Sequence, residues 1–270
     1  MSTFWRTSRL GGIRERGPPL KVTVCQMHDR GADLARDWEK LVLHVQRDAS
    51  DLVLLPETAF SRPFIETPDF DARVWKRAIV AHERWQARLV ELAPAVVVGT
   101  RPLQWGQRRF NQGFVWTPSQ GIRWINAKAA LRTHEGAWEG RWYHTARAPS
   151  TPIEIGHVVI SLLIGSELWS SDERYRQPAS DIDLLLTPRI GPPPGDLAWI
   201  IAGSKAAKRA RAYGLSSSRT VNGDSSRVGG WIVDPGGKIL AITSESRPFV
   251  SAALELRQPT STGSSADAEV

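Results

Sequence analysis

The most constraining feature of this chain is the alternation of short apolar segments with longer amphipathic ones. The short segments have the composition of buried strands, and the longer ones repeat apolar residues at helical spacing. Strands are expected at Lys21–Gln26, Asp51–Leu55, Ala95–Gly99, Phe114–Thr117, Ile122–Asn126, Val158–Ile164, Asp183–Leu186, Gly230–Val233 and Lys238–Thr243. Helices are expected at Asp33–Arg47, Arg73–Leu92, Ser171–Ser180 and Leu197–Tyr213. This alternation is typical of a layered α/β protein.

The body of the chain is predicted to be one domain. No polar linker interrupts residues 20–257 of the 270. Residues 1–19 are rich in arginine and end in Gly-Pro-Pro, which predicts a flexible basic arm. Residues 258–270 are small and polar, so they are expected to form a disordered tail.

Composition narrows the class of protein. Hydrophobic residues make up 41% and charged residues 23%, which excludes a fibrous or disordered chain. The longest apolar runs, such as Val158–Ile164, are well short of the roughly 20 residues that cross a bilayer. No apolar secretory signal opens the chain. Cys25 is the one cysteine, so no intramolecular disulfide can form, and the cytoplasm is the expected location.

The chain is basic, with 35 Lys and Arg against 28 Asp and Glu and a net charge of +7. Its arginines are scattered, and the densest basic group is Lys205–Arg211. We interpret this as a solvated surface, because net charge alone does not define a site. A nucleic-acid or acidic-partner surface is the less favoured interpretation, since only Trp199 and Tyr213 flank that group with aromatic rings.

Three polar motifs directly follow buried strands. Glu57 comes after Leu-Leu-Pro, where a partly desolvated carboxylate can act as a general base. Lys128 ends an apolar strand and could stabilise an oxyanion, although for this residue taken alone a surface lysine is the favoured interpretation. Residues 164–169 (Ile-Gly-Ser-Glu-Leu-Trp) form a tight turn of the kind that holds a nucleophile.

In this order, the motifs resemble the nitrilase, or carbon–nitrogen hydrolase, superfamily. The resemblance covers nearly the whole body and rests on Lys21–Gln26, Leu55–Glu57, Val98–Thr100, Asn111, Lys128, Leu163–Trp169, Asp183–Pro188, Ala210–Ala212 and Gly230–Lys238. It implies a four-layer α-β-β-α sandwich that forms a homodimer or higher homo-oligomer. It implies no cofactor, and no spacing of His, Asp, Glu or Cys matches a metal site.

The resemblance also implies a Glu–Lys–Cys triad with an assisting second Glu. Glu57 matches the general base and Lys128 the lysine that stabilises the tetrahedral intermediate. The second carboxylate is open: Glu135 fits the distance counted from the lysine and is slightly preferred, whereas Glu139 fits the distance counted back from Trp142-Tyr143. Glu167 matches an acidic residue two positions after the nucleophile, where a structural role is expected.

The sequence departs from the family at the nucleophile. Gly165 stands where the cysteine should be, and glycine cannot form a thioester. Cys25 lies on the first strand, outside any motif, and is expected to be a small core residue. Ser166 is one residue on, and its side chain is expected to point away from Glu57 and Lys128.

These residues leave several functions open. The favoured one is a catalytically impaired protein or pseudoenzyme that binds a small amide-, acid- or amine-like ligand, with Trp138, Trp142 and Trp169 as candidate pocket residues. An active hydrolase could instead use water, held in the volume vacated at Gly165 and activated by Glu57. Gly165 could also be an engineered change in an active enzyme. A basic nucleic-acid or protein-binding module is the distant alternative.

Overall fold

The structure is a computed structural model, and it describes residues 18–29, 31–63, 67–131, 138–146, 151–170, 182–190, 195–220 and 229–256. Its strands are β1 (Leu20–Met27), β2 (Leu52–Leu54), β3 (Val96–Trp105), β4 (Arg108–Thr117), β5 (Gly121–Ala127), β6 (Ile153–Ile155), β7 (Val158–Leu162), β8 (Leu184–Pro188), β9 (Tyr213–Arg219), β10 (Trp231–Val233), β11 (Ile239–Ile242) and β12 (Phe249–Leu254). Its helices are α1 (Gly31–Asp48), α2 (Ala72–Gln86), η3 (Leu89–Leu92), α3 (Glu139–Trp142), η4 (Gly165–Ser170) and α5 (Asp196–Ala210). The expected helix at Ser171–Ser180, the tail and most of the basic arm lie outside the described residues.

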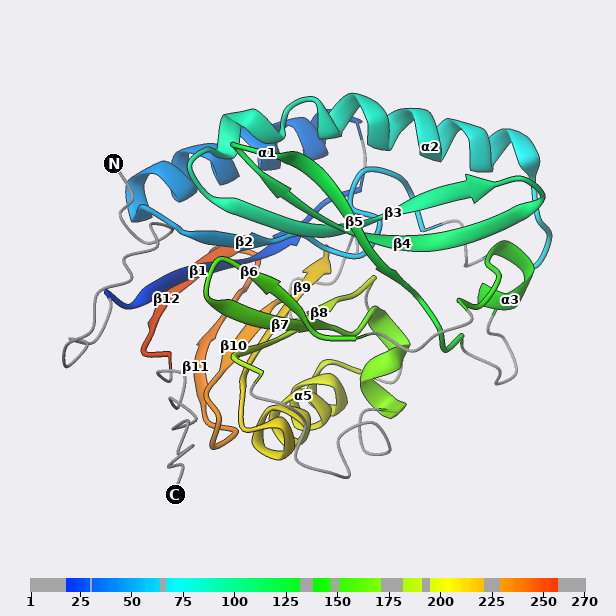
Figure 1. The fold of residues 1–270 in the computed structure, drawn as a ribbon. Helices are drawn as coiled ribbons and strands as arrows, with labels where there is room; N and C mark the ends of the chain where they lie inside the picture. The colour runs from blue at the N-terminus through cyan, green and yellow to red at the C-terminus, as the bar shows by residue number, and fades with distance from the viewer. Residues whose placement is uncertain are drawn as a thin grey trace, which may run out of the picture.

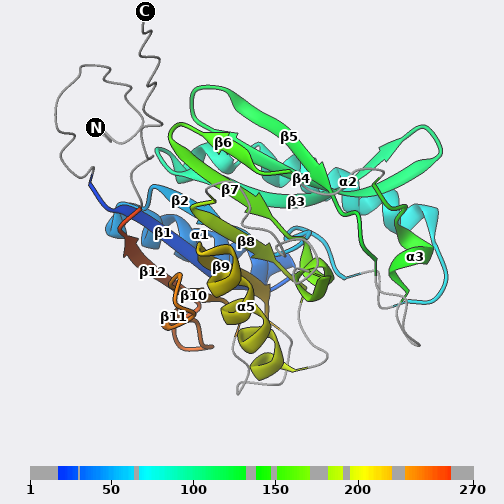
Figure 2. The same cartoon turned by 60° about the horizontal axis from the view of Figure 1, so that its bottom comes forward.

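The helices enclose the strands in four layers. Figure 1 shows α1 and α2 above one group of strands and α5 below the other, and Figure 2 shows the same order of layers after a turn. The strand order β5-β4-β3-β2-β1-β9-β8-β7-β6 runs through both groups, with β12 beside β1 and β10 and β11 beside β9. The predicted α-β-β-α sandwich is therefore confirmed.

The two sheets meet along a short seam. In the described part of the chain, strand β1 pairs with β9 through two positions, Gln26 with Ser218 and Met27 with Arg219. On either side of this seam, β3, β2 and β1 run parallel, as do β7, β8 and β9. Parallel strands bring their carboxyl ends to one edge, which is where α/β folds gather functional groups.

The apolar strands are buried on both faces, which explains their continuous hydrophobic runs. In β3, Val96 and Val98 point into the core between the sheets, whereas Val97 points toward the helices. The alternation follows from the two-residue period of a strand. Leu184 and Leu185 of β8 divide in the same way between the inner core and the α5 side.

Two expected helices end earlier than predicted. The predicted helix Arg73–Leu92 is split, since α2 ends at Gln86 and the short η3 follows. The predicted helix Leu197–Tyr213 ends at Ala210, because Arg211 adopts a left-handed conformation with φ +53° and closes the helix. Tyr213 then begins β9, a strand that the sequence did not predict.

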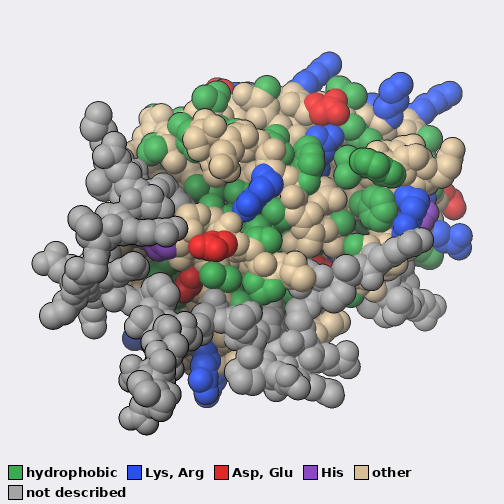
Figure 3. Space-filling view, viewed as in Figure 1, with side chains coloured by type: hydrophobic (Ala, Val, Ile, Leu, Met, Phe, Trp, Pro, Cys, Tyr) green, Lys and Arg blue, Asp and Glu red, His purple; other side chains and the backbone are tan. Residues whose placement is uncertain are grey.

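The surface shows no single basic face in the view of Figure 3, where Lys and Arg side chains are spread among apolar and uncharged ones. On this face the positive charge is scattered. Among the described helices, none is long and apolar enough to cross a membrane.

Candidate active site

The three predicted motifs converge at one end of the sandwich. Glu57 follows β2, Lys128 follows β5, and Gly165 follows β7 and begins η4. Glu139 begins α3. Glu57 and Lys128 follow strands of one sheet, and Gly165 follows a strand of the other. The site is therefore built from both sheets of the sandwich.

Lys128 is the centre of a buried ionic cluster. Its Nζ lies 2.7 Å from Glu139 Oε1 and 3.1 Å from Glu57 Oε1. The three side chains are 1–3% exposed. Such a cluster holds a cation between two carboxylates, and these residue types are among those that serve general-base and oxyanion-stabilising chemistry.

The negative charges determine the protonation of their neighbours. Burial alone would lower the pKa of Lys128, but the carboxylates of Glu57 and Glu139 outweigh burial and raise the pKa above its usual value. Lys128 therefore stays cationic. Burial, together with the same two carboxylates, raises the pKa of the Tyr143 hydroxyl well above its usual value, so the phenol stays protonated.

A side chain at position 165 would extend into this cluster. A Cβ built on it would lie 2.4 Å from Glu57 Oε2 and 3.1 Å from Lys128 Nζ. Its φ of +53° is a left-handed conformation, which glycine adopts without steric cost. A side chain at position 165 would therefore face the carboxylate and the ammonium, but the carboxylate now fills the space of its first carbon.

The residues that follow Gly165 divide into two roles. Ser166 Oγ lies 3.3 Å from Glu139 Oε2, so the hydroxyl faces the ionic cluster through Glu139. This contact was not expected from the sequence. Glu167 accepts hydrogen bonds from the backbone N–H groups of Ala129 at 2.9 Å and Ile164 at 2.8 Å. Glu167 thus ties the segment after Lys128 to the turn at Gly165, as a structural residue would.

Two further residues hold Glu57 in place, and sequence reasoning gave neither of them a role in the site. Asn111 of β4 donates from Nδ2 to Glu57 Oε1 at 2.7 Å. Arg219, at the end of β9, donates from Nε and Nη2 to the Glu57 carbonyl oxygen at 3.1 and 2.9 Å and also contacts Thr58. The sequence offered one weak signal, because Asn111 belongs to the motifs that carry the family resemblance.

Of the two candidates for the second carboxylate, Glu135 and Glu139, the structure describes Glu139. Glu139 contacts Lys128 directly, whereas Glu135 lies outside the described residues. We therefore build the site on Glu139. The assignment of its catalytic role remains a prediction.

The tryptophans and the cysteine take up different positions. Trp142 is fully buried and donates to the Thr67 carbonyl at 2.9 Å, and the half-buried Trp138 packs beside it. Trp169 is 42% exposed and lies 4.9 Å from the Trp199 ring. The proposed ligand contacts of these tryptophans remain predictions. Cys25 is fully buried in the cluster that faces α1, and burial strongly raises the pKa of its thiol.

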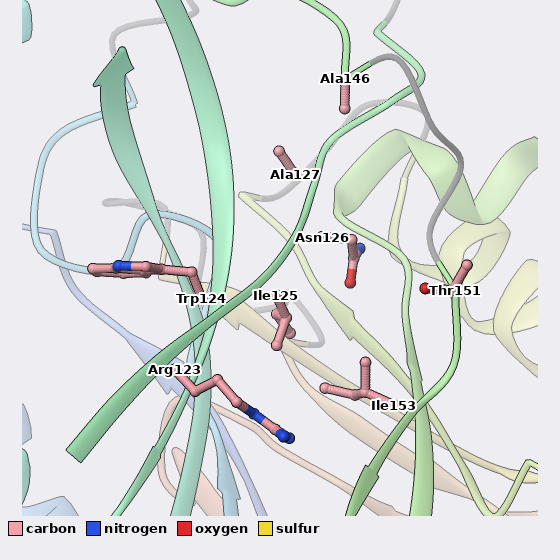
Figure 4. A pocket seen from close by; sticks show the side chains of 8 residues that line it. All are labelled: Arg123, Trp124, Ile125, Asn126, Ala127, Ala146, Thr151 and Ile153. Carbon is pink, nitrogen blue, oxygen red and sulfur yellow. The ribbon is translucent and has the colours of Figure 1, made fainter. Parts of the chain in front are cut away.

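A cavity of about 440 Å³ opens elsewhere, between the edges of β5 and β6. Figure 4 shows its lining residues, Arg123, Trp124, Ile125, Asn126, Ala127, Ala146, Thr151 and Ile153. None of the four site residues Glu57, Lys128, Glu139 and Gly165 lines it. The cavity is therefore distinct from the ionic cluster.

Comparison with known protein families shows to which family this chain belongs. The sequence profile of the carbon-nitrogen hydrolase family matches residues 21–261. This chain belongs to the carbon-nitrogen hydrolase family. A search of curated protein sequences found no significant match.

Solved structures of the family share the fold. A carbon-nitrogen hydrolase from Helicobacter pylori G27 has a TM-score of 0.74 at 15% identity, over 89% of this chain and 90% of that one. An amidase from Nesterenkonia sp. has a TM-score of 0.70 at 15% identity, over 90% and 93%. The carbon-nitrogen hydrolase superfamily protein XC1258 from Xanthomonas campestris has a TM-score of 0.66 at 21% identity, over 87% and 90%. At these identities the likeness extends to the fold alone.

Proposed function

We propose that this carbon-nitrogen hydrolase family protein binds a small amide-like ligand at the cluster of Glu57, Lys128 and Glu139, and that it is impaired in thioester chemistry. The observation that carries the proposal is the direction of the missing side chain at Gly165. That direction runs between the carboxylate and the ammonium, where a cysteine would find both a base and an oxyanion partner. The acid–base groups are present, and the nucleophile is not.

The ionic cluster supports binding of a neutral amide more than binding of a free acid. Two carboxylates and one ammonium give these three contacting groups a net negative charge, which opposes the binding of a further carboxylate. All three are at most 3% exposed, so a ligand must displace part of the protein to reach them. Slow association is the expected consequence.

Water-based hydrolysis is the second candidate, and the geometry supports it less. That mechanism needs a water molecule beside Glu57, in the volume vacated at position 165. The Glu57 carboxylate itself occupies that volume, since its Oε2 lies 2.4 Å from the ideal Cβ position. Its other oxygen accepts from Lys128 and Asn111, so Glu57 is engaged as an ion-pair partner.

The experiment compares the wild-type protein with Gly165→Cys on amides, nitriles and N-carbamoyl compounds, by ammonia release. Gly165→Ala is the matched control, because it adds the same Cβ without a thiol. We expect ammonia release only from Gly165→Cys. Turnover by the wild type would show that the protein is not impaired. If none of the three proteins is active and wild type binds no amide in ligand-observed NMR, the assignment of an amide site is wrong.

Two further expectations belong to the same proposal. We place the protein in the cytoplasm, on the basis of its single cysteine. We also propose a homo-oligomer, as the family resemblance implies, with a small-molecule ligand and without nucleic acid. Light scattering coupled to size-exclusion chromatography tests the oligomer, and salt-dependent binding to DNA would contradict the last point.

A further inference from the structure

Asn111 connects the two charged residues on which the site depends. It lies in β4 and is fully buried. Its side-chain Nδ2 donates to Glu57 Oε1 at 2.7 Å, and its backbone carbonyl accepts from the Lys128 N–H at 2.9 Å. One residue therefore fixes the carboxylate through its side chain and the lysine through its main chain.

The orientation of the Asn111 amide follows from chemistry. The ionised Glu57 carboxylate can only accept hydrogen bonds, so the NH2 group of Asn111 must face it. Its Oδ1 then points elsewhere, and among the residues that the structure describes it has no hydrogen-bond partner. A fully buried acceptor without a partner is rare in native proteins and calls for an explanation.

Among the residues described, a free acceptor and a free donor belong to the same buried cluster. Oδ1 and Nδ2 belong to one planar amide, and Nδ2 binds the Glu57 oxygen that also accepts from the Lys128 ammonium. An ammonium has three N–H groups, and within the described residues the carboxylates of Glu57 and Glu139 take two of them. An acceptor and a remaining donor are what the N–H and carbonyl groups of a primary amide require.

We propose that Asn111 Oδ1 accepts a hydrogen bond from the N–H group of the bound ligand and so makes the site selective for ligands that carry an N–H group. This inference rests on the proposed function, because it concerns the same site. It adds a residue and a rule of selectivity: a ligand of equal shape without an N–H leaves Oδ1 buried and unpaired, and binds more weakly.

The test uses two ligands of nearly equal shape, butyramide and 2-pentanone. They share a propyl chain and a carbonyl group, and differ in carrying NH2 or CH3. Dissociation constants from ligand-observed NMR give the selectivity ratio of each protein. We expect wild type to prefer butyramide by roughly tenfold or more, since a site built to pair an N–H rejects an analogue without it.

The variants separate recognition from general stability. Asn111→Leu removes the acceptor at similar volume, and Asn111→Ala removes it with a smaller side chain in case leucine prevents folding. Both should bring the ratio close to one. Asn126→Leu is the matched control, because Asn126 also has a buried Oδ1 without a partner in the described structure but lines the separate cavity. It should keep the wild-type ratio.

The outcomes are distinct. A folded Asn111 variant that keeps the preference for butyramide overturns the inference and leaves the proposed function standing. Equal binding of both ligands by wild type has the same meaning. If wild type binds neither ligand, the proposed amide site is wrong, and the role of Asn111 falls with it.

Discussion

The strongest prediction concerns the space at Gly165. An alanine there would place its Cβ 2.4 Å from Glu57 Oε2, so the carboxylate must move away. A left-handed φ costs a residue with a Cβ about 1–2 kcal/mol. Weakening the hydrogen bonds of Glu57 to charged or amide partners costs about 1.5–3 kcal/mol more. We therefore expect Gly165→Ala to lower the free energy of unfolding by about 2.5–5 kcal/mol.

A matched glycine isolates the two contributions. Gly106 has a similar φ of +56°, but a Cβ there meets nothing within 4 Å. Gly106→Ala should therefore cost only the backbone part, about 1–2 kcal/mol. Glu57→Asp shortens the carboxylate and removes the clash, so Gly165→Ala should also cost only the backbone part in that background.

The assay is urea unfolding followed by the fluorescence of the twelve tryptophans, for wild type, the three single variants and the double variant. The double-mutant cycle should yield a coupling of about 1.5–3 kcal/mol between positions 57 and 165. If Gly165→Ala costs no more than Gly106→Ala, or if the cycle shows no coupling, the carboxylate does not occupy the space of a side chain at position 165 and our reasoning is refuted.

Three further predictions follow from buried polar groups. Burial lowers the pKa of His82 to about 3, whereas in the unfolded chain it is near 6.5. The free energy of unfolding should therefore fall between pH 6.5 and pH 3, by up to about 1.4 kcal/mol per pH unit. Urea unfolding at several pH values should show a weaker pH dependence for His82→Leu. Lys128→Met leaves two buried carboxylates without their cation and should cost about 3–5 kcal/mol in the same assay, so near-wild-type stability would contradict a buried ion pair. Glu167→Gln turns an NH2 group toward a backbone N–H and should cost about 1–3 kcal/mol, and an unchanged urea midpoint would show that Glu167 is not a brace.

The strands around the site were predictable because their sequences are apolar without interruption. Residues such as Val96–Val98 are all apolar. A strand that is buried on both faces needs no alternation of polar and apolar residues, so a continuous apolar run is enough to predict it. Strand β9 was missed for the opposite reason. It contains Ser216 and Ser217, which have little hydrophobic signal. Their hydroxyls donate to the carbonyls of Thr187 and Leu54, so burial is satisfied by hydrogen bonds that no local pattern encodes.

The residue types that meet in the candidate site could be read from the sequence, whereas their contacts could not. Glu57, Lys128 and Gly165 each follow a strand, and strand ends are visible in a sequence. Asn111 and Arg219 act through contacts with a residue 54 and 162 positions away. Their roles depend on how β4 and β9 are placed in space, which the residue types alone do not specify.

Because the site is divided between two sheets, its geometry depends on how the sheets are placed relative to each other. Glu57 and Lys128 follow strands of one sheet and Gly165 follows a strand of the other. Among the described residues, the two sheets share two paired positions, between β1 and β9. Closely packed interiors transmit small displacements over long distances. A substitution deep in the inter-sheet core, such as Leu162→Ala, could therefore change the spacing between Glu57 and Gly165 without touching either residue. The affinity for the proposed ligand would then report on the packing of the core between the sheets.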